Sequence, residues 1–113
     1  MYSKELIRGT LKPIILNLLT EHGKMYGYQI CQVIKTQTTG ELSIREGSLY
    51  PALYKLKEEG LVTVEMIPNG KRVRQYYSLA KPGRIAVKEQ LGEFSKFLRT
   101  MNSIFHPENN PAI

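Results

Sequence analysis

The strongest constraint on the fold is an apolar repeat near the end of the chain. Apolar residues recur at intervals of four and three, which is the spacing of the a and d positions of a heptad repeat. A helix from about Pro82 to Phe105 would be roughly 36 Å long. A chain of 113 residues fits one domain and is too small to cover such a helix. The repeat therefore predicts a dimer interface made of Val87, Leu91, Phe94, Leu98, Met101 and Phe105.

The first predicted helix is marked by apolar residues at helical spacing between positions 7 and 19. It should end at Gly23, a residue type that favours helix ends. Its start has two interpretations. If Thr10 is the N-cap, Pro13 falls in the first turn, where its missing N–H costs nothing. If the helix begins near Ser3, Pro13 should kink it.

A second helix is expected over residues 26–37, and a third in the stretch "EGSLYPALYKLKEEGLV", ending at Gly60. The third helix has two different faces, because leucines gather on one side and tyrosines lie opposite. With Ser48 as N-cap, Pro51 would lie in the first turn. The leucine face, predicted to pack on the core, contains Leu49, Leu53 and Leu56, and the outward face contains Tyr50, Pro51 and Tyr54.

Two stretches with alternating polarity, "LVTVEMI" and "RVRQYYSL", predict a pair of strands. The dipeptide Asn69–Gly70 between them predicts a tight hairpin, because both residues accept a positive φ. The residues expected to face inward are Val62, Val64, Met66, Val73, Tyr77 and Leu79.

This order of elements predicts an α+β fold, mainly α: a winged helix-turn-helix of three helices and a two-stranded wing, followed by a long C-terminal dimerisation helix. The DNA-binding domain would span residues 1–79 and the dimerisation helix residues 80–106. Residues 107–113 are expected to form a disordered tail.

Charge is distributed unevenly along the chain. The sequence has 16 basic and 10 acidic residues, and the stretch from Met66 to Lys88 contains six basic residues and no acid. Such a segment favours a polyanion, most often nucleic acid, although a solvated surface would have the same composition.

The winged-helix pattern predicts a specific role for these charges in DNA binding. The N-terminal part of the third helix would enter a DNA major groove, with the amide end near Ser48 attracting a phosphate. At the wing tip, Gly70 would let the backbone approach DNA, and Lys71, Arg72 and Arg74 would contact phosphates or the minor groove. The alternative is a winged-helix module that binds another protein.

The sequence argues against an enzyme. It has a single cysteine, Cys31, two distant histidines and no aspartate, so no metal-ligand spacing occurs. No nucleotide-binding glycine loop is present, and no cofactor is expected. Cys31 fits a buried structural thiol. Without a membrane span or signal peptide in the pattern, we expect a cytoplasmic protein.

Three motifs, "MYGYQI", "EGSLYPALYKLKEEGLV" and "RQYYSLAKPGR", resemble in order and spacing the PadR family of bacterial transcriptional regulators. The resemblance extends from about Ile7 to Phe105. With a single C-terminal helix, the chain is similar to the compact subfamily that includes multidrug-responsive repressors.

The resemblance implies a homodimeric repressor that binds a palindromic operator in double-stranded DNA. It implies that the last helix forms most of the dimer interface. Carried over position by position, the DNA contacts would be Tyr28, Ser48, Tyr50, Pro51, Tyr54, Lys55, Gly70, Lys71 and Arg72.

The resemblance also implies a site for a small hydrophobic or aromatic effector at the dimer interface. Some compact members stack a tryptophan of the last helix on such a ligand, whereas this chain has no tryptophan and places Phe94 there. The same seam also fits a plain dimer core. A second departure is Ala80, where a threonine able to cap the last helix is common. The neighbours of Phe94 in the effector site would be Ile14, Asn17, Val87 and Leu91.

Overall fold

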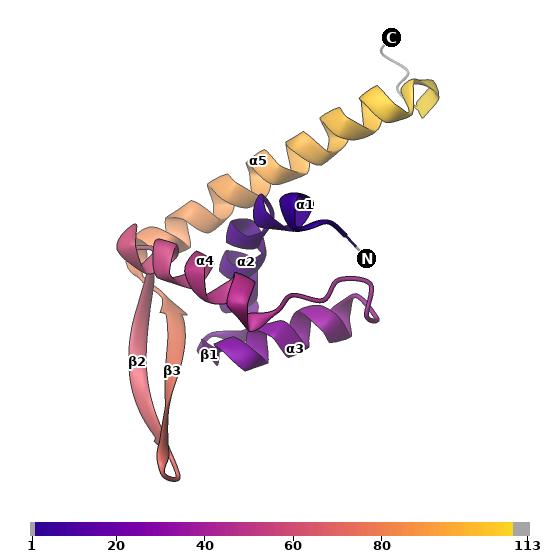
Figure 1. Ribbon diagram of the computed structural model, residues 1–113. Coiled ribbons are helices and arrows are strands. Elements are labelled where there is room, and N and C mark those ends of the chain that lie inside the picture. The colour runs from indigo at the N-terminus through magenta and orange to yellow at the C-terminus, as the bar shows by residue number, and fades with distance from the viewer. Residues whose placement is uncertain (1, 110–113) are drawn as a thin grey trace.

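The computed structural model of the chain describes residues 2–109 and shows a helical body from which a hairpin and a long helix project in different directions (Figure 1). The two projections make the molecule elongated, with extents of 59 × 31 × 21 Å. The helices are α1 (Lys4–Arg8), α2 (Leu11–His22), α3 (Gly27–Gln37), α4 (Glu46–Glu58), α5 (Lys81–Phe105) and the 3-10 turn η1 (Pro107–Asn109), and the strands are β1 (Met25–Tyr26), β2 (Val62–Asn69) and β3 (Arg72–Leu79).

The N-terminal region combines the two predicted helix starts. Ser3 caps the short helix α1 by accepting a hydrogen bond from the Leu6 N–H at 3.3 Å. Helix α1 ends at its C-cap, Gly9, and α2 begins after Thr10. Pro13 is therefore the third residue of α2, where no intrahelical bond is lost and no kink is required. Gly23 ends the helix with a φ of 75°, as predicted.

Helix α4 begins earlier than the sequence predicted. Its N-cap is Arg45, and the N–H groups of Ser48 and Leu49 both donate to the Arg45 carbonyl at 3.0 Å. The predictions that Ser48 is the N-cap and that Pro51 lies in the first turn are therefore wrong. Pro51 lies inside the helix, so the Gly47 carbonyl has no N–H to accept from one turn later.

The sheet has three strands in the order β1-β3-β2, all antiparallel, whereas the sequence predicted two. Strand β1 pairs Met25 with Tyr77 and Tyr26 with Tyr76. At two residues it is too short to show an alternating pattern, so periodicity could not reveal it. This pairing fixes the start of α3 beside the base of the wing.

The hairpin turn is displaced by one residue from its predicted position. Asn69 pairs with Arg72, so the two-residue loop is Gly70–Lys71. Gly70 has a φ of 66°, and among the described non-glycine residues only Thr39 has a positive φ. A positive φ at the first loop residue alone matches a type II′ turn, which favours glycine there.

The outer half of the wing lies beyond the body of the protein. Val62 and Tyr77 near its base are buried, as predicted, but Met66 and Val73 are 58% and 56% exposed. The prediction that these two residues face a core is wrong, because the strands extend past the helices that they would pack against (Figure 1).

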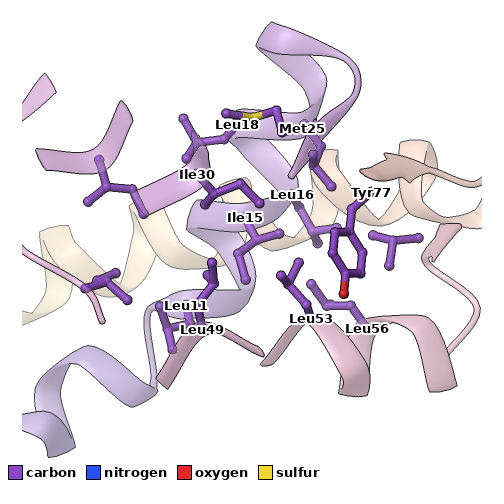
Figure 2. Close-up of a cluster of buried hydrophobic side chains, with 14 of the residues drawn as sticks. Leu11, Ile15, Leu16, Leu18, Met25, Ile30, Leu49, Leu53, Leu56 and Tyr77 are labelled. Carbon is purple, nitrogen blue, oxygen red and sulfur yellow. The ribbon is translucent and has the colours of Figure 1, made fainter. Parts of the chain in front are cut away.

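The core forms where α2 crosses the leucine face of α4 (Figure 2). The most deeply buried side chains come from these two helices, from Met25 of β1 and from Ile30 of α3. Ile44, in the connection before α4, is also buried and belongs to the same cluster. The members of this cluster drawn with labels are Leu11, Ile15, Leu16, Leu18, Met25, Ile30, Leu49, Leu53, Leu56 and Tyr77.

Helix α5 starts against the body and then leaves it. Its N-cap, Ala80, makes no side-chain cap, but the Ala80 N–H donates to the Leu61 carbonyl at 2.9 Å. A Cβ atom at Gly83 would lie 2.0 Å from the same carbonyl oxygen, so only glycine allows this approach. Pro107–Asn109 form a 3-10 turn where a disordered tail was predicted, and residues 110–113 lie outside the described region.

We expect Gly83→Ala to lower the free energy of unfolding by about 2 kcal/mol, because the methyl group would push α5 away from the Leu61 backbone. Gly92→Ala is the matched control, since a Cβ there meets no atom within 4 Å. That change should raise stability by about 0.5–1 kcal/mol through helix propensity. Urea denaturation at one protein concentration measures both, and equal effects would contradict the packing of α5 on Leu61.

Candidate nucleic-acid interface

The outward stripe of α4 is fixed by its buried leucines. Because Leu49, Leu53 and Leu56 are at most 1% exposed, the opposite side of the helix must face solvent. Tyr54 is 62% exposed on that side, and the neighbouring Glu58 carboxylate, followed by desolvation, raises the pKa of its phenol. The predicted contact residues on this stripe, all exposed, are Ser48, Pro51, Tyr54 and Lys55.

Tyr50 has a different environment from Tyr54. It is 40% exposed, and its hydroxyl would lie 2.6 Å from a Cβ built on Gly27 at the start of α3. Burial, then Glu46 and then Cys31, raise the pKa of Tyr50. Tyr50 therefore packs against α3 with one face, instead of pointing freely outward as predicted.

Three of the predicted contact elements meet around Gly27. Tyr28, the next residue in α3, is 54% exposed. Tyr26, the residue before, pairs with Tyr76 at the base of the wing, and Tyr50 brings in the first half of α4. The structure thus places the starts of α3 and α4 and the wing base together, although these segments are far apart in the sequence.

The exposed cations of the wing lie at its tip, far from Gly27. Gly70, Lys71 and Arg72 are exposed at the tip. Arg72 and Tyr76 are four positions apart in β3, which corresponds to about 14 Å. Arg74 is only partly exposed, and its guanidinium lies 4.3 Å from the centroid of the Tyr26 ring. The structure therefore holds Arg74 within the protein, unlike the other predicted wing contacts.

Ion pairs reduce the acidic charge beside these elements. Glu59, at the end of α4, binds Lys12 at 3.0 Å, and Glu65 of β2 binds Lys24 at 2.8 Å. Lys55, Lys71 and Arg72 are in no ion pair within the described residues. The surface formed by α4 and the wing tip is thus suited to a polyanion.

Sequence reasoning did not find a basic groove that borders this stripe of α4. A cavity of about 640 Å³ lies between α1, the start of α2 and α4. Ser48 and Lys55 line it, together with three cations from the N-terminal helices: Lys4, Arg8 and Lys12. No local pattern signals this site, because α1 and α4 come together only in the folded chain.

Comparison with known proteins identifies this arrangement. The family described as the transcriptional regulator PadR-like family matches residues 15–89. The chain belongs to this family. Its members are DNA-binding transcription regulators and not enzymes, which confirms the predicted family, the winged-helix fold class and the absence of an enzymatic role. Among curated proteins, none matches the sequence.

Solved structures of similar proteins agree with the fold. A transcriptional regulator from Clostridium thermocellum is 30% identical, with 91% of this chain and 97% of that chain covered and a TM-score of 0.76. The protein smu.1704 from Streptococcus mutans is 32% identical over 84% and 85% of the two chains, with a TM-score of 0.70. Bacillus subtilis PadR, solved in complex with operator DNA, is 31% identical over 73% of this chain and 46% of that chain, with a TM-score of 0.67.

The residues predicted for an effector site lie on two helices that pack together, α2 and α5. Ile14, Leu91 and Phe94 are half-buried, and Asn17 donates to the Glu21 carboxylate at 3.2 Å. Val87 is only 6% exposed and belongs to the core of its own chain. The structure therefore leaves Val87 little surface for either a ligand or a partner protomer.

Along residues 2–109, no helix is long and apolar enough to cross a membrane. The same residues contain no group of three or more His, Cys, Asp or Glu side chains that could hold a metal ion.

The two tyrosines of α4 should respond differently to truncation. We expect Tyr50→Ala to lower the free energy of unfolding by about 1–2 kcal/mol, since it removes apolar area packed on Gly27. Tyr54→Ala, which loses an exposed ring, should change it by less than about 0.5 kcal/mol. Chemical denaturation followed by circular dichroism measures both, and a loss in Tyr50→Ala as small as that expected for Tyr54→Ala would show that Tyr50 does not support the fold.

Proposed function

We propose that this PadR-family chain is a homodimeric repressor, acting in the cytoplasm, that binds a palindromic operator in double-stranded DNA. The observation that carries the proposal is the combination of an exposed stripe on α4 with a cationic wing tip. Helix α4 would enter the major groove, and Lys71 and Arg72 would bind the flanking phosphates. Bacillus subtilis PadR, the similar protein solved with operator DNA, supports this assignment.

Two α4 helices are needed to read a palindrome, and the apolar face of α5 supports a dimer. Phe97, Leu98, Ile104 and Phe105 are between 52% and 70% exposed on the single chain. Contiguous apolar surface of this kind favours burial against a second copy. We therefore infer an interface formed by Leu91, Phe94, Leu98, Met101 and Phe105, without Val87.

The proposal includes release by a small hydrophobic or aromatic effector. The half-buried residues Ile14, Leu91 and Phe94 would offer it an apolar surface where α2 and α5 meet the partner protomer. An effector could act only by binding one separation of the two α4 helices better than another. A dimer core without a ligand would use the same residues. Dye binding at the Phe94 region therefore distinguishes an effector site from a plain dimer core.

DNA binding can be tested with an operator selected from a pool of random duplexes. If each protomer neutralises about three phosphates, the logarithm of the association constant should fall against the logarithm of salt concentration with a slope of about −5. Tyr54→Ala should weaken specific binding more than nonspecific binding, whereas Arg72→Ala should weaken both.

A slope near zero, or no selected operator at low salt, would exclude the repressor and favour a winged-helix module that binds protein. Equal effects of the two substitutions on specific and nonspecific DNA would mean that α4 does not read bases.

The dimer can be tested with a charge in the seam. Leu98→Glu should raise the dimer dissociation constant at least about 100-fold, because two carboxylates would be buried without partners. Thr100→Glu places the same charge on the other side of α5 and should leave the dimer intact. Sedimentation measures both, and an intact Leu98→Glu dimer would contradict the proposed seam.

A further inference from the structure

Arg74, in the outer half of β3, makes two contacts with side chains of other strands. Its guanidinium carbon lies 4.3 Å from the centroid of the Tyr26 ring, within the range of a cation–π interaction. In the amide orientation that satisfies both groups, the Asn69 side-chain oxygen accepts hydrogen bonds from Nε and Nη2 of Arg74, both at 3.0 Å. Arg74 thus connects its own strand to β1 and to the end of β2.

The Tyr26 ring, on which Arg74 stacks, is held in place by contacts of its own. The ring lies edge-on to the Tyr76 ring, with centroids 5.2 Å apart and an interplanar angle of 66°. The Tyr26 backbone pairs with Tyr76, and its N–H donates to the Gln29 side chain at 3.3 Å. Because Tyr26 immediately precedes α3, any contact with its ring ties the wing to that helix.

The wing needs such a tie because its outer half has no core of its own. Met66 and Val73 are more than half exposed, and a two-stranded hairpin alone is marginally stable in water. The ion pair between Lys24 and Glu65 lies closer to the base, where Glu65 pairs with Tyr76, and both side chains are exposed. Exposed ion pairs contribute little, so the contacts of Arg74 should dominate the direction of the tip.

We propose that Arg74 is a positioning residue for DNA binding: by stacking on Tyr26 it fixes the angle between the wing and α3, and so places Lys71 and Arg72 against the DNA backbone. The proposal rests on the DNA-binding function proposed above. Arginine suits this role because its planar guanidinium can stack flat on a ring while two of its nitrogens donate to Asn69, a geometry that the single ammonium of lysine cannot reproduce.

A double-mutant cycle tests the proposal on operator affinity. Tyr26→Leu and Arg74→Ala should each weaken binding about five- to tenfold, and the double variant should lose no more than either single one, because both remove the same contact. Tyr26→Phe keeps the ring and should bind like the wild type, whereas Arg74→Lys should not restore binding. Losses that multiply in the double variant would mean that Arg74 acts independently of Tyr26.

The salt dependence separates positioning from direct contact. Arg72→Ala, the matched control two residues away, should reduce the size of the salt slope by about 2 per dimer, because each protomer loses one phosphate contact. Arg74→Ala should lower the affinity and leave the slope near the wild-type value. A reduction equal to that of Arg72→Ala would overturn the proposal and make Arg74 a phosphate contact.

Hydrogen exchange without DNA tests the contact itself. Arg74→Ala should speed amide exchange at least about tenfold at Ile67, which pairs with residue 74 across the hairpin, while Arg72→Ala leaves it unchanged. Unchanged exchange in Arg74→Ala would refute the positioning role even if Tyr26→Leu fails to fold. If the wild type binds no operator but exchange responds as expected, the DNA-binding function fails while the structural tie between wing and α3 stands.

Discussion

The packing of the α4 leucines against α2 is the interaction on which the rest of the structure depends. Leu49 and Leu53 are fully buried, and they meet Ile15 and Leu16, which are buried equally. A helix held along one side by such contacts has no freedom to rotate about its axis. The stripe that carries Tyr54 and Lys55 is therefore presented to solvent in one orientation, which a reading helix requires.

Around this core, the elements that would meet DNA are connected by close contacts rather than by a continuous apolar interior. Gly27 is small enough to let Tyr50 lie against α3. One residue earlier, Tyr26 pairs with Tyr76 and supports Arg74. The start of α3 thus contacts α4 on one side and the wing on the other. A shift of α3 would be transmitted to both proposed DNA-contacting elements.

Helix α5 relates to the body differently, because only its first turns are covered. Gly83 lies against the Leu61 backbone and Val87 joins the core, whereas Leu98 and Phe105, further along the seam, are 53% and 70% exposed. The heptad pattern thus divides into a part that binds α5 to its own chain and a part that remains available to a second copy. The sequence gives both parts the same spacing, so periodicity could not separate them.

The sequence alone determined the four longer helices, the two wing strands, the leucine face of α4 and the concentration of charge after Met66. These features depend on local periodicity and composition, which a single chain displays without knowledge of its contacts.

The predicted positions of the α4 N-cap and of the hairpin turn were wrong. Serine is common at N-caps and asparagine in tight turns, but here the backbone bonds to Arg45 set the start of α4, and the pairing of Asn69 with Arg72 sets the turn. Only the tertiary structure decided which of the residues expected to face outward pack against another segment of the protein. Tyr50 and Arg74 resemble Tyr54 and Arg72 in sequence, but Gly27 and Tyr26, from a distant segment, lie against the first pair and not the second. Contacts between segments far apart in the chain leave no local pattern, and for this reason the sequence could not distinguish the residues proposed to touch DNA from the one proposed to position the wing.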